Sequence, residues 1–421
     1  MNKHLLIFFL IRVLTYPLTL LPYSAIHKIG KGLGWCAYFV MSKFRKRTLS
    51  NLSLANNTLG LSEKELISVA KGSFQNLMIT CLEYAKLKQE KNIQNIAICE
   101  NPELAASLVK EGKPPIFFCG HQANWELLFL EGTSRMPGVA IGRPIKNKIL
   151  YEWVLSIRQK YGGKIITPKN AIREGLRGLK KGAFLGIVGD QGMPDSGFCS
   201  PFLGRNSWSS PIPAILSYRT GSPIMVATLK RHQAKYHIHY SDPIWPNIEE
   251  PMEKEIDRMM RQALQVFEEA VKATPDQWLW QHNRWKQQTL DRLKRPFRQE
   301  SLCVIMPQDK EQSDLLIPHL SIFRKLYPHE FITFLIPQGF EISCLPEHVE
   351  TQVYQSTNEL FIKDYRFKLV FDFYGHPPIR RHFLKQSAFH VFTLKDLQKL
   401  SQATPADNLS NILTKAACHA S

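Results

Sequence analysis

The sequence predicts an α/β protein that begins with an apolar helix and ends with a smaller second α/β domain. Short apolar runs typical of buried strands alternate with helical stretches between residues 114 and 245, and this pattern restarts after residue 300. The chain has 421 residues, of which 44% are hydrophobic and 21% charged. That composition is typical of a globular protein with room for two or three domains.

The N-terminal segment predicts a membrane anchor or interfacial helices over residues 1–45. Residues 5–21 are almost entirely apolar, with Arg12 as the single charge, and approach the length that spans a bilayer. A second apolar patch at residues 35–41 runs into the basic stretch 43–47, which could meet anionic headgroups. No cleavage signature of a signal peptide follows. The alternative is a hydrophobic helix buried in the domain.

Residues 46–288 are expected to form the main domain. The stretch 61–87 has apolar residues at helical spacing, and Ser62 with Glu65 forms a capping-box pattern. A second amphipathic helix is predicted from Pro251 and ends at Thr274 before a proline. Between these helices the strand-like runs are PPIFFCG, GVAIGRP, KIITP, GAFLGIVGD, SPIMVATLK and YHIHYSDPI.

A basic, proline-bearing linker is predicted over residues 289–300, followed by an accessory α/β domain over residues 301–421. The runs LCVIMP, FITFLIP, LVFDFYG and HVFTL indicate a small parallel sheet. They suggest half of a nucleotide-sugar-type domain, but the glycine-rich phosphate loop of such a site is missing. An accessory or docking module is the preferred interpretation, and glycosyl transfer the alternative.

The charge balance points to an anionic partner. Lys and Arg number 54 against 36 Asp and Glu, a net charge of +18 that suits nucleic acid, an anionic membrane or a phosphorylated substrate. No nucleic-acid-binding motif accompanies it, so nucleic acid is not expected as a partner. The eight cysteines, Cys344 among them, form no Cys-x-x-Cys pair, which disfavours a zinc site or a disulfide framework. No metal and no cofactor are predicted.

A candidate active site lies at the end of the run IFFCG. His121 follows this strand, Asn124 is a candidate helix cap, and Glu126 lies at the start of the next helix. Ligands of open α/β sheets bind at this edge. If Glu126 accepts a hydrogen bond from one imidazole nitrogen of His121, the other can take a proton from a substrate hydroxyl. The alternative is a purely structural histidine.

The surrounding motifs resemble the lysophospholipid acyltransferase superfamily, whose first motif is His-x4-Asp/Glu, and within it the late lipid A acyltransferases. The matching blocks are Arg143 to Asn147, the Gly162-Gly163 turn, Asp190-Gln191, the loop Pro201 to Gly204, LSYRTGSPIMV and QWLWQHNRWK. The resemblance covers about residues 1 to 288. It implies a glycerolipid-acyltransferase-like mixed sheet flanked by helices.

The resemblance also implies residue roles. His121 would be the general base on an acceptor hydroxyl, and Glu126 its orienting partner. Arg143 would face a phosphate or the developing oxyanion, to which a fixed guanidinium is suited. Asp190 would be a site residue at a strand end, with holding Arg143 or capping a loop as alternatives.

Further substrate-binding positions follow from the same blocks. Asn147 and Gln191 would line the substrate, and Gly204 and Arg205 would shape the loop over an anionic headgroup. A solvated surface charge is the alternative for Arg205.

The implied reaction is transfer of a fatty acyl chain from acyl carrier protein to a hydroxyl of a Kdo-bearing lipid A precursor in lipopolysaccharide biosynthesis. The implied location is the bacterial inner membrane, with the catalytic domain on the cytoplasmic side. Both partners are acidic, in keeping with the basic chain. An acyltransferase for another glycerophospholipid or glycolipid is the first alternative, and a non-enzymatic basic protein that binds membrane or nucleic acid the second.

Overall fold

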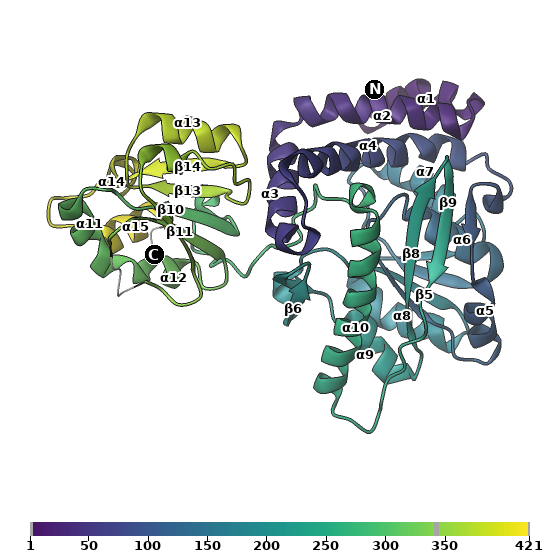
Figure 1. Ribbon diagram of the computed structural model, residues 1–421. Coiled ribbons are helices and arrows are strands. Elements are labelled where there is room, and N and C mark those ends of the chain that lie inside the picture. The colour runs from purple at the N-terminus through teal and green to yellow at the C-terminus, as the bar shows by residue number, and fades with distance from the viewer. Residues whose placement is uncertain (1–2, 341–344, 420–421) are drawn as a thin grey trace. The chain divides into compact units, whose positions relative to one another are not determined.

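The chain forms two compact units in a computed structural model that describes residues 3–340 and 345–419 (Figure 1). The first unit comprises Met1–Val40 and Leu61–His282, and the second Met41–Gly60 and Asn283–Ser421. Each unit is therefore built from two separate stretches of the chain. Cys344 lies outside the described residues.

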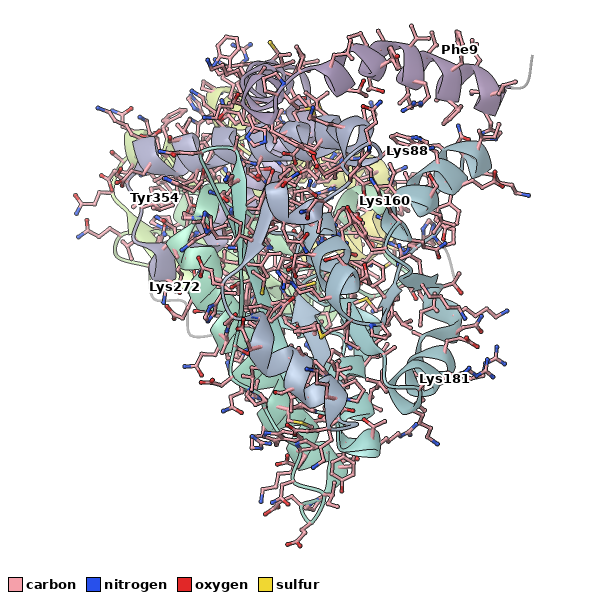
Figure 2. All side chains as sticks on the ribbon, turned by 90° about the vertical axis from the view of Figure 1, so that its right-hand side faces the viewer. Phe9, Lys88, Lys160, Lys181, Lys272 and Tyr354 are labelled. Carbon is pink, nitrogen blue, oxygen red and sulfur yellow. The ribbon has the colours of Figure 1, made fainter. Side chains whose placement is uncertain are left out.

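The first unit begins with exposed apolar helices. Helix α1 (Lys3–Thr15) has no buried residue, and Phe9, 60% exposed, points away from the rest of the unit (Figure 2). The predicted alternative of a buried N-terminal helix is therefore wrong. By length and composition, Lys3–Leu20 is the one helical stretch of the described residues apolar enough to cross a membrane. Helix α2 (Tyr23–Val40) also exposes apolar side chains, including Trp35 and Phe39.

Helix α2 packs closely on the long helix α4 (Glu63–Leu87) because glycines face the contact. A Cβ atom added to Gly34 would lie 2.3 Å from the Cα of Gln75, whereas one added to Gly32 would meet nothing within 4 Å. The predicted capping box of α4 is confirmed, since Ser62 and Glu65 satisfy each other's backbone N–H groups.

A seven-stranded mixed sheet forms the centre of the first unit, in the order β1-β9-β8-β2-β5-β3-β4. Neighbouring strands are parallel except β8 and β9. The bounds are β1 Ala97–Cys99, β2 Ile116–Cys119, β3 Gly138–Ile141, β4 Lys164–Ile166, β5 Phe184–Val188, β8 Ile224–His232 and β9 Lys235–Tyr240. All six predicted runs are strands of this sheet, and β1 is an addition that the pattern did not predict.

Helices flank this sheet, and a two-stranded hairpin lies beside it. The helices are α5 Pro102–Lys110, α6 Glu126–Arg135, α7 Lys148–Arg158, α8 Ala171–Lys180, α9 Ile212–Thr220 and α10 Met252–Ala273. Helix α10 ends before Thr274, as predicted. The hairpin consists of β6 (Phe198–Phe202) and β7 (Arg205–Ser209), which were not predicted. Lys181, just after α8, projects into solvent (Figure 2).

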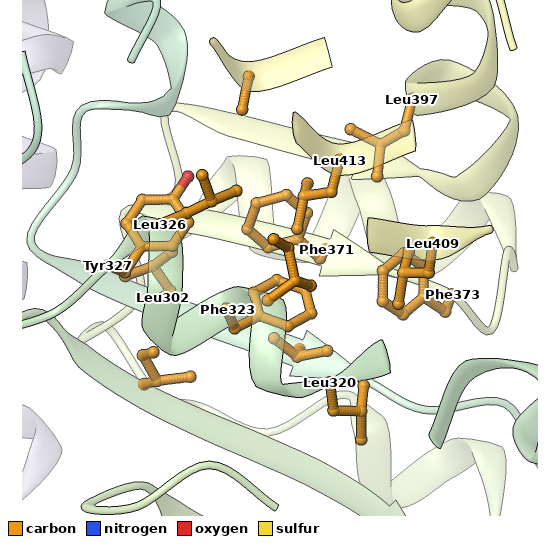
Figure 3. Close-up of a cluster of buried hydrophobic side chains, with 14 of the residues drawn as sticks. Leu302, Leu320, Phe323, Leu326, Tyr327, Phe371, Phe373, Leu397, Leu409 and Leu413 are labelled. Atoms are coloured by element: carbon orange, nitrogen blue, oxygen red, sulfur yellow. The ribbon is translucent and has the colours of Figure 1, made fainter. Parts of the chain in front are cut away.

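The second unit contains a five-stranded parallel sheet in the order β12-β11-β10-β13-β14. The strands are β10 Ser301–Ile305, β11 Phe331–Pro337, β12 Glu350–Tyr354, β13 Leu369–Asp372 and β14 His390–Thr393. The helices are α11 Lys310–Leu316, α12 Ser321–Leu326, α13 Pro377–Lys385, α14 Leu394–Ser401 and α15 Leu409–Ala417. A cluster including Leu302, Phe323 and Phe371 fills one side of the sheet (Figure 3). The predicted parallel sheet is confirmed.

Helix α3 (Ser42–Leu59) belongs to the second unit although it precedes most of the first in sequence. Its Asn51 accepts a hydrogen bond from the fully buried ammonium of Lys368, which also pairs with Glu300. Lys46, expected near lipid headgroups, instead donates to the backbone oxygen of Ala388. The C-terminal extension is thus tied to an N-terminal helix by buried polar contacts.

Candidate active site

His121 lies just beyond β2, and Asp190 just beyond the neighbouring parallel strand β5. The two strands pair with Cys119 opposite Val188, so both residues emerge at the same sheet edge. His121 donates its backbone N–H to Asp190 Oδ2 at 2.7 Å, and its Nδ1 lies 2.7 Å from Asp190 Oδ1. A Cβ atom on Gly120 would lie 2.7 Å from Asp190 Oδ2, so this glycine lets the carboxylate approach the chain.

Asp190 is an ionised, fully enclosed acceptor. It is 3% exposed and also accepts a hydrogen bond from Trp278 Nε1 at 2.7 Å. Burial alone would raise the pKa of this carboxyl, but the charge of His121 and the donors of His121 and Trp278 lower the pKa to about 2. A carboxylate on Nδ1 fixes the hydrogen of a neutral imidazole there, which leaves Nε2 of His121 as the basic nitrogen.

The predicted partnership between His121 and Glu126 is not the arrangement in the structure. Glu126, the first residue of α6, accepts two hydrogen bonds from Arg158, at 2.7 Å to Oε2 and 2.5 Å to Oε1. Burial would lower the pKa of Arg158, but Glu126 raises it. Neighbouring parallel strands end at the same edge of a sheet, so Asp190 reaches Nδ1 of His121 from the adjacent strand. Glu126 forms a separate ion pair with Arg158.

The loop that carries His121 is held by α4 and by the segment after α10. Ala123 has a left-handed backbone with φ +46°, and its N–H donates to Gln277 O at 2.7 Å. Its carbonyl accepts from Asn76 Nδ2 at 3.2 Å and Thr80 Oγ1 at 3.1 Å. The backbone N–H of Leu279 donates to the carbonyl of His121 at 3.1 Å. These bonds maintain an unfavourable conformation that places His121 at the strand end.

Asn124 is not the helix cap that the sequence predicts. Helix α6 starts after Trp125 without a side-chain cap, and Asn124 Nδ2 donates to Glu83 Oε2 at 2.7 Å. Glu83 is 0% exposed and is also bound by His27 Nε2 at 2.6 Å and by the hydroxyl of Tyr236 at 2.8 Å. A buried carboxylate on α4 with three hydrogen-bonding partners therefore anchors the loop, and no local sequence pattern indicates this contact.

A cavity of about 370 Å³ opens beside His121. Its polar lining residues are His121, Glu126, Arg143, Arg158, Gln191 and Ser210. Most of the other walls are apolar and include Phe117, Phe129, Phe184 and Ile187. Asp190 is not among the lining residues. It therefore contacts the imidazole of His121 from outside the cavity, while His121 itself lines the cavity. The site can therefore hold an apolar chain with a base at its polar end.

A sequence profile of the bacterial lipid A biosynthesis acyltransferases matches residues 2–287. The chain belongs to this family. Its reaction class is accordingly acyl transfer in lipid A synthesis, a process associated with membranes. No curated protein matched the chain in a separate search. The matched residues end five residues after the first unit does, at His282.

The remaining residues singled out in this acyltransferase divide into two groups. Gln191 lies in the cavity wall, with Nε2 3.3 Å from His121 Nε2, and the exposed Arg143 lines the same wall. Asn147 instead caps α7 through Leu150 N and donates to His4 O at 3.0 Å, which ties α7 to α1. The side-chain amide of Asn147 therefore has a structural role.

Gly204 and Arg205 lie outside the cavity walls. Leu203 and Gly204 form the two-residue turn between β6 and β7, with φ +48° and +75°, and Arg205 begins β7. The backbone N–H of Leu203 donates to Glu268 on α10. No cluster of three or more His, Cys, Asp or Glu side chains suited to a metal ion occurs within residues 3–340 and 345–419.

Proposed function

We propose that this acyltransferase moves a fatty acyl chain from acyl carrier protein to a hydroxyl of a Kdo-bearing lipid A precursor. The observation that supports it best is the pairing of His121 with the ionised Asp190 at the polar end of an apolar cavity. A fatty acyl chain suits the apolar walls, and its thioester carbonyl would then lie near the imidazole.

The chemistry requires one proton to move twice. His121 Nε2 takes the proton of the acceptor hydroxyl as its oxygen attacks the thioester carbonyl. The carbon–sulfur bond then breaks, and the thiolate leaves with the proton from the imidazolium. Asp190 stabilises that imidazolium from the Nδ1 side without leaving its own hydrogen bonds.

Two guanidinium groups lie at the polar end of the cavity, and they suit different tasks. Arg158 is neutralised by Glu126, so this pair shapes the wall and contributes little net charge. Arg143 lines the wall and is exposed, a position suited to the phosphate of an acceptor or to the developing oxyanion. Gln191 beside His121 Nε2 can donate to an acceptor hydroxyl.

We place the enzyme at the inner membrane with the first unit on the cytoplasmic side. The exposed apolar residues of α1 and α2, among them Phe9, Leu14 and Trp35, form a surface that suits the lipid interface. A membrane-bound, phosphorylated acceptor would meet the basic chain there.

The test is a detergent-solubilised transfer assay. Acyl carrier protein charged with chains of several lengths is supplied with a labelled Kdo-bearing tetra-acyl precursor, and wild type is compared with His121→Ala. Transfer by wild type and its loss in a folded variant support the proposal. Transfer that depends on His121 but uses only a lysophospholipid would reassign the acceptor. Absence of transfer to every acceptor would reject acyl transfer from this donor.

A further inference from the structure

Residues of β5 line the cavity from the sheet edge near His121 inward, and they differ in size. On one face of the sheet, β5 presents Val188 at its end, then Gly186, then Phe184. Successive residues on the same face of a strand are two positions apart, so Val188 and Phe184 are separated by about 13 Å along the strand. All three residues line the cavity, which therefore extends well below the sheet edge.

Two small residues, Gly186 and Ala140, lie side by side in the cavity wall. Gly186 pairs with Phe117 of β2 on one side and with Ala140 of β3 on the other. A Cβ atom added to Gly186 would lie 3.4 Å from the Cβ of Ala140 and 3.9 Å from Phe129 Cδ2. These are ordinary contact distances, so a side chain fits at position 186 but occupies cavity space.

Three aromatic rings in the cavity wall, those of Phe117, Phe184 and Tyr240, lie close together. The ring centroids of Phe117 and Phe184 are 5.4 Å apart, and those of Phe117 and Tyr240 are 4.5 Å apart. Phe184 is held in place because its ring fits over Gly138, where an added Cβ would approach Phe184 Cζ to 2.3 Å. The hydroxyl of Tyr240 bonds to the buried Glu131 at 3.3 Å, which fixes the third ring.

We infer that Gly186 and Phe184 determine how long an acyl chain this enzyme accepts. This inference rests on the proposed function. The terminal methyl of the chain stops against the rings of Phe117, Phe184 and Tyr240, and the absence of a side chain at Gly186 lets the chain reach them. A bulkier residue at 186 stops the chain earlier, and a smaller one at 184 extends the space.

The experiment measures transfer rates with acyl carrier protein carrying chains of eight to eighteen carbons in two-carbon steps. The variants are Gly186→Ala, Gly186→Val and Phe184→Leu, with Gly32→Ala as the matched control because nothing lies within 4 Å of its added Cβ. Gly186→Val should lower the rate with the wild-type optimum at least tenfold while the shortest chains change less than threefold. Gly186→Ala should show a smaller shift in the same direction, and Phe184→Leu should move the optimum to longer chains.

An unchanged preference in folded Gly186→Val and Phe184→Leu overturns the inference, and so does an equal loss at every chain length. Folding is checked by thermal unfolding, and Gly186→Ala, whose methyl fits without contact below 3.4 Å, keeps the test valid if the larger changes unfold the protein. If wild type transfers no chain of any length, the failure belongs to the proposed function. If wild type transfers chains and the variants keep the wild-type chain-length preference, only the inference about Gly186 and Phe184 fails.

Discussion

Replacing Asp190 by asparagine should disable His121 without removing any atom from the cavity wall. Oδ2 of Asp190 accepts two N–H groups, from the His121 backbone and Trp278, while Oδ1 lies 2.7 Å from Nδ1 of His121. An asparagine would keep its oxygen at the Oδ2 position and turn its NH₂ group toward Nδ1. The imidazole would then accept at Nδ1 and carry its hydrogen on Nε2, the wrong tautomer for a base.

The expected loss in transfer rate is about 10⁴-fold, the loss produced when the buried aspartate of a Ser-His-Asp triad becomes asparagine. The assay is single-turnover transfer to the labelled acceptor at saturating donor, with the exposed Asp195→Asn as the matched control. A rate for Asp190→Asn within tenfold of wild type, at unchanged thermal stability, would refute the reasoning.

The remaining predictions concern stability. The pKa of the Asp190 carboxyl is about 2, below its ordinary value of 3.8, so its ionised form stabilises the folded protein by about 2 kcal/mol above pH 3.8. This contribution should be lost as the pH falls from 3.8 toward 2, and urea unfolding measured across that pH range checks it. Gly34→Ala should lower the free energy of unfolding by about 3 kcal/mol, because the added methyl group overpacks the contact with α4. Gly32→Ala, at an exposed position of the same helix, should raise the free energy of unfolding by about 1 kcal/mol. Equal unfolding temperatures for the two variants would contradict this reasoning. Glu126→Gln should cost about 3 kcal/mol by leaving Arg158 without its partner, against under about 1 kcal/mol for Glu250→Gln in an exposed pair.

The predicted parts of the site are those that depend on local sequence. A β-branched and aromatic run ended by Gly120 predicts a strand end at His121, whatever the rest of the chain does. The capping box of α4 is equally local, since Ser62 and Glu65 are three residues apart. These elements form where the sequence predicts them because their determinants lie within one turn or one strand.

The missed parts depend on contacts between distant residues. His121 and Asp190 are 69 positions apart and meet through the register of β2 and β5, which no local pattern specifies. Asn124 has the composition of a cap, but the buried carboxylate of Glu83, 41 residues away, takes its amide. Tertiary hydrogen bonds overrode the local preference in both cases.

The second unit shows the same division. Its apolar strands were predicted, whereas β12 was missed because this edge strand exposes most of its side chains. The grouping of α3 with the C-terminal extension depends on Lys368 reaching Asn51 across 317 positions. The local sequence of residues 42–59 does not specify which unit helix α3 joins.

A double-mutant cycle on the single-turnover transfer rate tests the central claim most directly, using His121→Ala, Asp190→Ala and the double variant. If Asp190 acts by setting the tautomer and charge of His121, the double variant should lose no more rate than His121→Ala alone. Losses that multiply would mean that the two residues act independently, and the His121–Asp190 pair would not be the catalytic unit.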